Sequence, residues 1–216
     1  MDYSGSDTRR ASRIRQKDDP GRTGMALRMD LTIGLIASLA LGAQVWAAPL
    51  VSEEYQIKAA FMYNFIKFVE WPKERFSSDK DPIVIGVVGK DPFGETLDEV
   101  VQKPVKNRSL TIKRFASASE DPEPVHPQLD AIRQCHVLFV SPSERKVSKR
   151  LMAAIGNSAI LTVGDASGFL EEGGIINFSI EEKKIRFEIG LAKARSAKLD
   201  ISSQLLRLAK RVDEGK

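Results

Sequence analysis

The chain has 216 residues, of which 42% are apolar, and this is enough for one sizeable hydrophobic core and favours a single folded domain. That apolar content is too high for a disordered protein and too low for a polytopic membrane protein. Its 33 basic and 29 acidic residues leave a formal charge of only +4, so the sequence carries no electrostatic footprint for nucleic acid.

The N-terminal segment has the pattern of an export signal. An uncharged apolar run at residues 31–43 follows Arg28 and precedes Val45-Trp46-Ala47, which has the small-x-small pattern of a signal-peptidase cleavage site. We therefore predict a leader and signal peptide over residues 1–47, cleavage after Ala47, and a periplasmic domain over residues 48–216 without stable membrane insertion. A retained membrane anchor is the alternative, but the apolar run is shorter than the roughly 20 residues that a spanning helix needs.

The first element of the mature chain is expected to be a helix from Ser52 to Val69. Two apolar stripes run along it at helical spacing, and between them they contain Ile57, Phe61, Phe65, Phe68, Tyr55, Ala59, Met62, Ile66 and Val69. A helix that is apolar over most of its circumference must be covered on two sides, by the sheet and by either another helix or another molecule. We expect Trp71-Pro72 to end this helix.

Apolar runs of strand length then alternate with helical patterns. The expected strands are residues 83–88, 109–115, 136–140, 159–163, 175–180 and 184–189, and the expected helices are 92–101, 129–134, 142–155, 190–197 and 202–212. Asp91-Pro92 and the capping box Ser141-Pro142-Ser143-Glu144 are the expected starts of two of these helices. The pattern predicts a three-layer α/β fold, in which a mostly parallel sheet of about six strands has helices on both faces and a C-terminal antiparallel hairpin.

No motif in the sequence indicates catalysis or a metal site. The glycines at residues 86–91 lack the Walker A spacing, and residues 164–168 do not form a nucleophile elbow. Cys135 and His136 are neighbours on an expected strand, so their side chains should point to opposite faces and not share an ion. We expect no enzymatic activity, no metal and no cofactor. A small-molecule ligand, if bound, is expected at the carboxyl ends of the strands, beside the turns at 89–91, 141–143 and 164–168.

Charged residues alternate with apolar ones on the last expected strand. Arg186 and Glu188 face away from Phe187, and Asn177 on the neighbouring strand has a matching position. Two interpretations remain open, a solvated edge strand protected by its charges and a polar wall of a ligand or partner site. Cys135 is the only cysteine, which excludes an intrachain disulfide, and we expect it to be a small buried hydrophobe.

Three segments together resemble the YfiR-like family of bacterial periplasmic proteins. They are residues 57–72, which end in Glu70-Trp71-Pro72, residues 135–141, and the series from Ile160 to Leu206. The resemblance covers residues 52–210 and implies an exported α/β domain that tends to form a homodimer. The best-known type of member represses a membrane-bound diguanylate cyclase by binding its periplasmic part, which links envelope conditions to cyclic-di-GMP and biofilm formation.

The resemblance also defines an alternative and a departure. Some members are encoded beside outer-membrane receptors, so a receptor-associated accessory module or a periplasmic small-molecule binding module is the alternative function. The repressor type carries cysteine pairs that form disulfides, whereas this chain has Cys135 alone, so we do not expect an intramolecular redox switch.

We predict that the chain binds the periplasmic domain of an inner-membrane signalling protein. The residues expected to make this contact are Tyr63, Lys67 and Trp71 on and after the first helix, and Arg186 and Glu188 on the last strand. Because the first helix carries more apolar surface than one packing partner covers, it is the expected centre of the interface.

Overall fold

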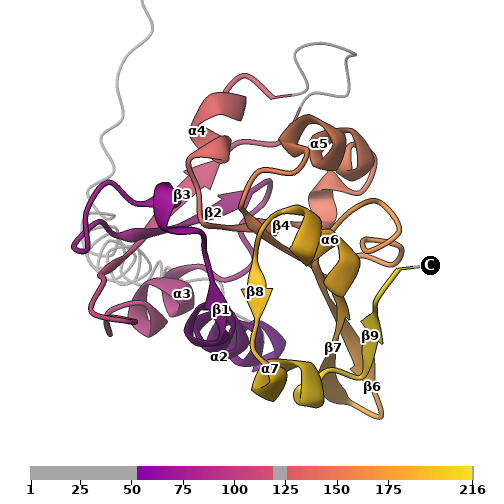
Figure 1. Ribbon diagram of the computed structural model, residues 1–216. Helices are drawn as coiled ribbons and strands as arrows, with labels where there is room; N and C mark the ends of the chain where they lie inside the picture. The colour runs from indigo at the N-terminus through magenta and orange to yellow at the C-terminus, as the bar shows by residue number, and fades with distance from the viewer. Residues whose placement is uncertain (1–52, 119–125, 216) are drawn as a thin grey trace, which may run out of the picture. The chain divides into compact units, whose positions relative to one another are not determined.

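The computed structural model describes residues 53–118 and 126–215 (Figure 1). The predicted signal peptide, its cleavage site and the domain boundary at residue 48 lie outside these ranges. A seven-stranded sheet has the strand order β3-β2-β4-β5-β6-β7-β9. Its strands are β2 (Ile83–Val88), β3 (Leu110–Phe115), β4 (Val137–Val140), β5 (Leu161–Gly164), β6 (Ile176–Glu181), β7 (Lys184–Gly190) and β9 (Arg211–Asp213).

The sheet is mostly parallel. The pairs from β3 through β2, β4 and β5 to β6 are all parallel, β6 and β7 form an antiparallel hairpin, and β9 pairs parallel with β7. The predicted mostly parallel sheet with a closing hairpin is therefore confirmed, with seven strands in place of about six.

Helices cover both faces of the sheet, as predicted (Figure 1). Side chains of β4 show the division, because Val137 and Phe139 join one apolar cluster and Leu138 and Val140 join the other. The first cluster includes side chains of α2, α3, α6 and α7, and the second includes those of α4 and α5. The helices are α2 (Glu53–Phe68), α3 (Glu95–Val100), α4 (Leu129–Arg133), α5 (Ser148–Ile155), α6 (Leu191–Ser196) and α7 (Ser203–Leu208).

The first helix ends at Phe68, one residue before its predicted end and three before Trp71. Val69 and Glu70 form the short strand β1, which pairs with β8 (Asp200–Ile201) in a separate two-stranded sheet. The sequence gives no sign of this pair, because two residues carry no readable period. Within the described ranges, no helix has both the length and the apolar character that a membrane crossing requires.

The predicted C-terminal helix over residues 202–212 is wrong in its second half. α7 starts as expected, with the Ser202 hydroxyl accepting a hydrogen bond from the Leu205 amide, but Ala209 adopts an extended conformation. The Lys210 amide then donates to the Phe187 carbonyl, and β9 begins at Arg211. A helical spacing of leucines was extended too far, because the free edge of β7 offered the backbone better hydrogen-bond partners.

Two other helices begin later than predicted. Asp91 accepts a hydrogen bond from the Phe93 amide, and Gly94 has a φ of 55°, so α3 starts only at Glu95. The predicted helix over 142–155 is divided into the 3-10 turn η2 (Pro142–Glu144) and α5. Ser141 caps η2 as expected, but the Glu144 carboxylate turns into the protein, where the Ala118 amide and the Ser143 hydroxyl donate to it, so no capping box forms.

Candidate functional site

The outer side of α2 is a narrow strip exposed to solvent. Its inner side is covered by the sheet, where Phe65 lies 5.5 Å from Phe178 and 5.0 Å from Phe187 between ring centroids. The exposed residues of the strip, which we call the α2 strip, are Gln56, Ile57, Ala60, Asn64 and Lys67. Ile57 is 42% exposed, so the helix is not completely buried in its own fold.

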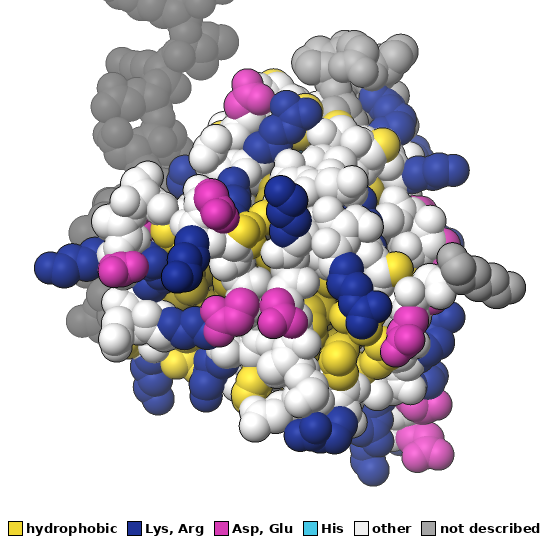
Figure 2. Space-filling model, in the orientation of Figure 1, with side chains coloured by type: hydrophobic (Ala, Val, Ile, Leu, Met, Phe, Trp, Pro, Cys, Tyr) yellow, Lys and Arg dark blue, Asp and Glu magenta, His cyan; other side chains and the backbone are white. Residues whose placement is uncertain are grey.

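Two of the predicted contact residues lie together at the edge of the α2 strip. Lys67 is exposed and its Nζ lies 5.8 Å from the centroid of the half-buried Tyr63 ring, within reach of a weak cation–π contact. Other large apolar side chains are exposed at the hairpin end and at the end of α7, namely Ile180 at 59% and Leu208 at 64%. Figure 2 shows hydrophobic side chains reaching the surface over α7 and β9.

Beneath α2, Lys58 and Asp165 form a buried ion pair. Lys58 Nζ lies 2.8 Å from Asp165 Oδ2, and each side chain is only 3% exposed. The Tyr55 hydroxyl donates to the same Asp165 oxygen at 2.7 Å, and Glu54 pairs with Lys58 from the solvent side. Burial, followed by the hydrogen bond to Asp165, raises the pKa of Tyr55, so its hydroxyl remains a donor. This cluster joins the first turn of α2 to the carboxyl end of β5.

The turns at the carboxyl ends of the parallel strands are occupied by their own hydrogen bonds. The Ser141 hydroxyl donates to the Lys90 carbonyl at 2.7 Å, and the Lys90 amide donates to the Ser143 hydroxyl at 3.0 Å. In the third turn, Asp165 is committed to the ion pair with Lys58. These three turns were the expected ligand site, yet their polar groups are largely engaged within the protein.

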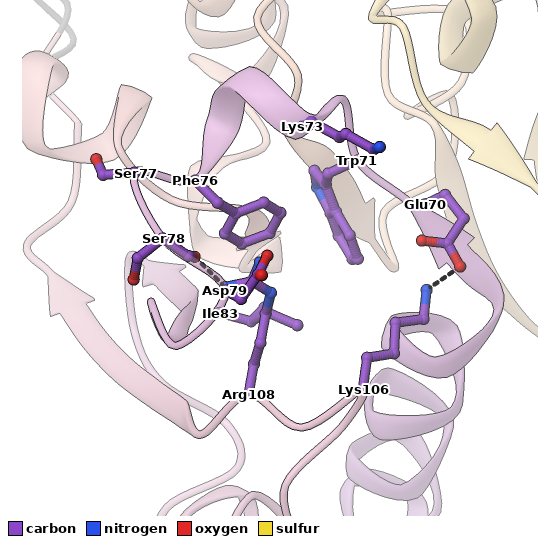
Figure 3. Close-up of a pocket in the computed structure, with 10 residues that line it drawn as sticks. All are labelled: Glu70, Trp71, Lys73, Phe76, Ser77, Ser78, Asp79, Ile83, Lys106 and Arg108. Carbon is purple, nitrogen blue, oxygen red and sulfur yellow. Dashed lines mark hydrogen bonds and ion pairs between the residues drawn. The ribbon is translucent and has the colours of Figure 1, made fainter.

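A pocket of about 560 Å³ instead lies at the opposite ends of the parallel strands, beside the amino end of β2 (Figure 3). Two segments far apart in the sequence form it, the stretch that follows α2 and the turn that precedes β3. Its lining residues are Glu70, Trp71, Lys73, Phe76, Ser77, Ser78, Asp79, Ile83, Lys106 and Arg108.

Phe76 and Arg108 line one wall of this pocket and form a stack of flat groups with His136. The Phe76 and His136 rings are nearly parallel, with centroids 4.6 Å apart and an interplanar angle of 8°. The guanidinium carbon of Arg108 lies 3.9 Å from the Phe76 centroid. Arg108 Nη1 also donates to the carbonyls of Ser78 at 2.7 Å and Asp81 at 2.9 Å. The stacking on Phe76 therefore fixes the orientation of the guanidinium plane, and the two hydrogen bonds of Nη1 fix its rotation within that plane.

The His136 ring in this stack is held neutral. Its Nδ1 accepts a hydrogen bond from the Val84 amide at 3.1 Å. Burial, with the nearby charges of Arg75 and Arg108, lowers the pKa of His136 to about 4. Because its ring carries no charge at neutral pH, it stacks on Phe76 as a flat, neutral surface.

Trp71, the third predicted contact residue, belongs to the pocket and not to the α2 strip. Its indole nitrogen donates to the His136 carbonyl at 3.0 Å, and the residue is 8% exposed. Beside it, Lys106 Nζ donates to the Val69 carbonyl and pairs with Glu70, each at 2.6 Å. Lys73 also lines the pocket, above Trp71 in Figure 3.

Arg186 and Glu188 lie on the other side of the sheet from the α2 strip. Phe187, between them on β7, contacts Phe65 of α2, so its two neighbours point away from that helix. Glu188 is opposite Asn177 in the strand register, as predicted for a polar wall, and pairs with Arg211 of β9 at 3.3 Å. β9 pairs with β7 only from Glu188 to Gly190, so Glu188 does not lie on an open edge, while the first residues of β7, Arg186 included, have no strand partner on that side within the described ranges. The five predicted contact residues thus form no single site.

Cys135 and His136 point to opposite sides, as expected for neighbours at a strand. Cys135 is buried in the apolar cluster under α4 and α5, which confirms its predicted role as a small hydrophobe. Burial raises the pKa of its thiol to about 11. Across the parts of the chain that the structure describes, no three His, Cys, Asp or Glu side chains gather in a way that would hold a metal ion.

Sequence reasoning missed Lys58 and the cationic pocket, for different reasons. Lys58 had a readable signal, because it lies one turn before Met62 and about two before Phe65, on the inward face of a helix. Phe76, Lys106 and Arg108 had none, because they lie in turns without periodicity. Phe76 is 30 residues before Lys106, and only the pairing of β2 with β3 brings the two turns together.

The fold resembles solved structures of low sequence identity. A conserved domain protein from Vibrio cholerae O1 biovar eltor superposes with a TM-score of 0.51 and 13% identity, covering 73% of this chain and 60% of that one. The ABC domain from Streptococcus pneumonia, solved in complex with L-Trp, gives a TM-score of 0.51 and 12% identity, covering 71% of this chain and 60% of that one. The chain therefore spans under two thirds of either protein, and the likeness shows the fold alone.

Comparison with protein families is more informative. No curated protein gives a significant match. The model of the YfiR/HmsC-like family matches residues 55–210, which contain the α2 strip, the buried ion pair and the pocket. This range is nearly the same as the one over which the sequence resembles the YfiR-like proteins. The chain belongs to the YfiR/HmsC-like family, whose members are periplasmic and act in general as regulators of diguanylate cyclase signalling.

Proposed function

We propose that this protein is a periplasmic regulator that binds the periplasmic domain of a membrane-bound diguanylate cyclase and represses it, and so controls cyclic-di-GMP and biofilm formation. The observation that carries the proposal is the α2 strip on a member of the YfiR/HmsC-like family. Ile57 stays 42% exposed there, although the helix buries Met62, Phe65 and Ile66 on its inner side.

The α2 strip has the chemistry of a protein-binding surface. Along the strip, apolar Ile57 and Ala60 are followed by polar Asn64 and then by the Lys67–Tyr63 pair. Interfaces commonly combine an apolar core, in which aromatic residues are enriched, with a polar rim. The strip also rests on a rigid base, because the Lys58–Asp165 ion pair and the phenylalanine cluster hold α2 against the sheet. A preorganised surface loses little entropy on binding.

Repression then needs only a difference in affinity. If the protein binds the inactive arrangement of the sensor more tightly than the active one, it shifts the population of the sensor towards the inactive state. A signal that releases the protein restores cyclase activity. No catalytic group is required at any step, in agreement with the absence of catalytic motifs from the sequence.

The test measures cyclic-di-GMP in cells. Deletion of this protein should raise cyclic-di-GMP and biofilm mass, and the full chain supplied in trans should lower both. A version that lacks residues 1–47, and so stays in the cytoplasm, is the matched control and should not complement. Unchanged cyclic-di-GMP after deletion, or full complementation by the control, would argue against the proposal.

The pocket favours a second candidate function, periplasmic small-molecule binding, including the role of an accessory module of an outer-membrane receptor. A volume of about 560 Å³ is within the range of ligand sites. The two functions are compatible, because the pocket lies at the amino end of β2 while the α2 strip lies on the outer side of a helix that covers one face of the sheet. Capture of an outer-membrane receptor, and no cyclase, from detergent-solubilised envelopes would favour this second function.

A further inference from the structure

Arg108 presents an unused hydrogen-bonding edge to the pocket. Its Nη1 is committed to two backbone carbonyls, at 2.7 and 2.9 Å, and its plane is stacked on Phe76. The partner of Nη2 within residues 53–118 and 126–215 is Asp79, at 3.8 Å, whose side chain is fully exposed. A pair of this length with an exposed partner is weak. Nη2 and Nε together therefore form an oriented donor fork that matches a carboxylate or a phosphate.

The pocket is lined by one more cationic than acidic side chain, since Lys73, Lys106 and Arg108 face Glu70 and Asp79. Lys106 is neutralised by Glu70 at 2.6 Å, which leaves Arg108 and Lys73 as the cations of the pocket. The Lys73 side chain makes no hydrogen bond or ion pair with any residue that the structure describes. The acidic group nearest to the fork is the Asp79 carboxylate, which is fully exposed to solvent. An incoming anion has only to displace this carboxylate from Arg108.

The size and the walls of the pocket require more than an inorganic ion. A volume of about 560 Å³ is that of a site for an organic molecule, not for a single phosphate. Trp71 and Ile83 supply apolar wall, and the Trp71 indole is fixed by its hydrogen bond to the His136 carbonyl. In Figure 3, Trp71 and the Phe76–Arg108 stack lie on either side of the same space. A flat ring fits beside such a surface.

We propose that this pocket binds a small organic anion in which a carboxylate or a phosphate monoester is joined to a flat apolar ring. The anionic oxygens accept hydrogen bonds from Arg108 Nη2 and Nε, the charge of Lys73 adds to the attraction, and the ring lies against Trp71. The proposal rests on the pocket alone, so it holds or fails independently of the identity of the signalling partner.

The first experiment is calorimetric titration of the protein purified from the periplasm with four probes. They are 2-naphthoate, 2-naphthyl phosphate, inorganic phosphate, which has no ring, and 2-naphthol, which has no charge at neutral pH. We expect the two naphthyl anions to bind at least about fivefold more tightly than the other two probes, and their order tells a carboxylate ligand from a phosphate ligand. Equal affinity for naphthol and naphthoate, or no binding of any probe, would overturn the proposal.

The second experiment places the binding in this pocket with variants that leave the structural bonds of Arg108 intact. Lys73→Met should weaken naphthoate binding about threefold, and Asp79→Asn, which removes the competing carboxylate, should strengthen it about twofold. Lys149→Met, on an exposed lysine of α5, is the control for general charge and should have no effect. Unchanged melting temperatures establish that all three fold. If Lys73→Met and Asp79→Asn bind naphthoate like the unaltered protein, the anion binds elsewhere.

Discussion

Lys58 shows what a single buried charge requires of its surroundings. Lys58 is 97% buried, so its ammonium group has lost most of its hydration. A carboxylate must compensate for the lost water contacts. Asp165 does so at 2.8 Å, and Glu54 adds a second carboxylate from the solvent side. The Tyr55 ring lies below the ammonium, with its centroid 4.4 Å from Nζ. Removal of Lys58 leaves Asp165 buried without a charge partner, and removal of Asp165 leaves Lys58 with the partly exposed Glu54 alone.

We predict that the Lys58–Asp165 pair behaves as a coupled unit in a double-mutant cycle. Lys58→Met alone or Asp165→Leu alone should lower the free energy of unfolding by about 3–5 kcal/mol, because a charge remains buried. The double variant should recover most of that loss, since two apolar side chains replace the pair. Urea unfolding of the four proteins measures this. Additive losses would mean that the two side chains do not act together.

The neutral state of His136 predicts a loss of stability in acid. The folded-state pKa of about 4 lies below the ordinary value of 6.5, so the unfolded chain binds a proton more readily between these values. The free energy of unfolding should therefore fall as the pH decreases from 6.5 towards 4, by an amount on the order of 3 kcal/mol from this group. Urea unfolding at several pH values tests this.

The control for this pH dependence is His136→Asn, whose Oδ1 takes the position of Nδ1 and can accept the hydrogen bond from the Val84 amide. Because asparagine does not titrate, the stability of this variant should depend less on pH over the same window. If the two proteins lose stability in parallel, His136 is not the group responsible.

At the scale of the element, the two faces of α2 have different roles. Its inner face holds the first apolar cluster together, and the α2 strip remains free for another molecule. Substitutions on the two faces should therefore separate stability from binding. An exposed side chain contributes little to folding, usually within about 0.5 kcal/mol.

We predict that Lys67→Ala weakens binding of the periplasmic sensor domain by about 1 kcal/mol, near fivefold, while the melting temperature stays nearly unchanged. Lys149→Ala on α5 is the matched control. Arg186→Ala tests the second group of predicted contacts, on the other face of the sheet, by the same titration. Loss of binding with Arg186→Ala and not with Lys67→Ala would move the interface from the α2 strip to that face.

The sequence predicts elements with a long regular period well. It does not predict elements whose secondary structure depends on hydrogen bonds to a neighbouring strand. β2 was placed at residues 83–88 and α2 within one residue at each end, because a buried strand and a two-striped helix leave clear patterns. β9 was taken for the end of a helix. Its three residues have no period of their own, and only the hydrogen-bonding groups of β7 make them a strand.

At the scale of the whole molecule, export decides which partners the protein meets. We predict that the protein recovered from the periplasm begins at Ala48, because the apolar run and the Val45-Trp46-Ala47 exit direct cleavage there. Intact-mass measurement of the periplasmic fraction checks this. The full-length chain in the membrane fraction would instead support the anchor. The homodimer that the family resemblance implies also stays a prediction, which light scattering of the same fraction tests.

The sequence by itself determined the fold class and the positions of the main strands along the chain, because alternation of buried strands and amphipathic helices is a local pattern that each segment carries alone. The family followed from the resemblance of residues 57–72, 135–141 and 160–206. It also placed Tyr63 and Lys67 on the accessible side of α2. Only the tertiary structure decided that Trp71 lies in a pocket, that Arg186 and Glu188 face away from α2, and that Arg108 stacks on Phe76. These facts depend on which strands become neighbours, and contacts between distant segments leave no period in the chain.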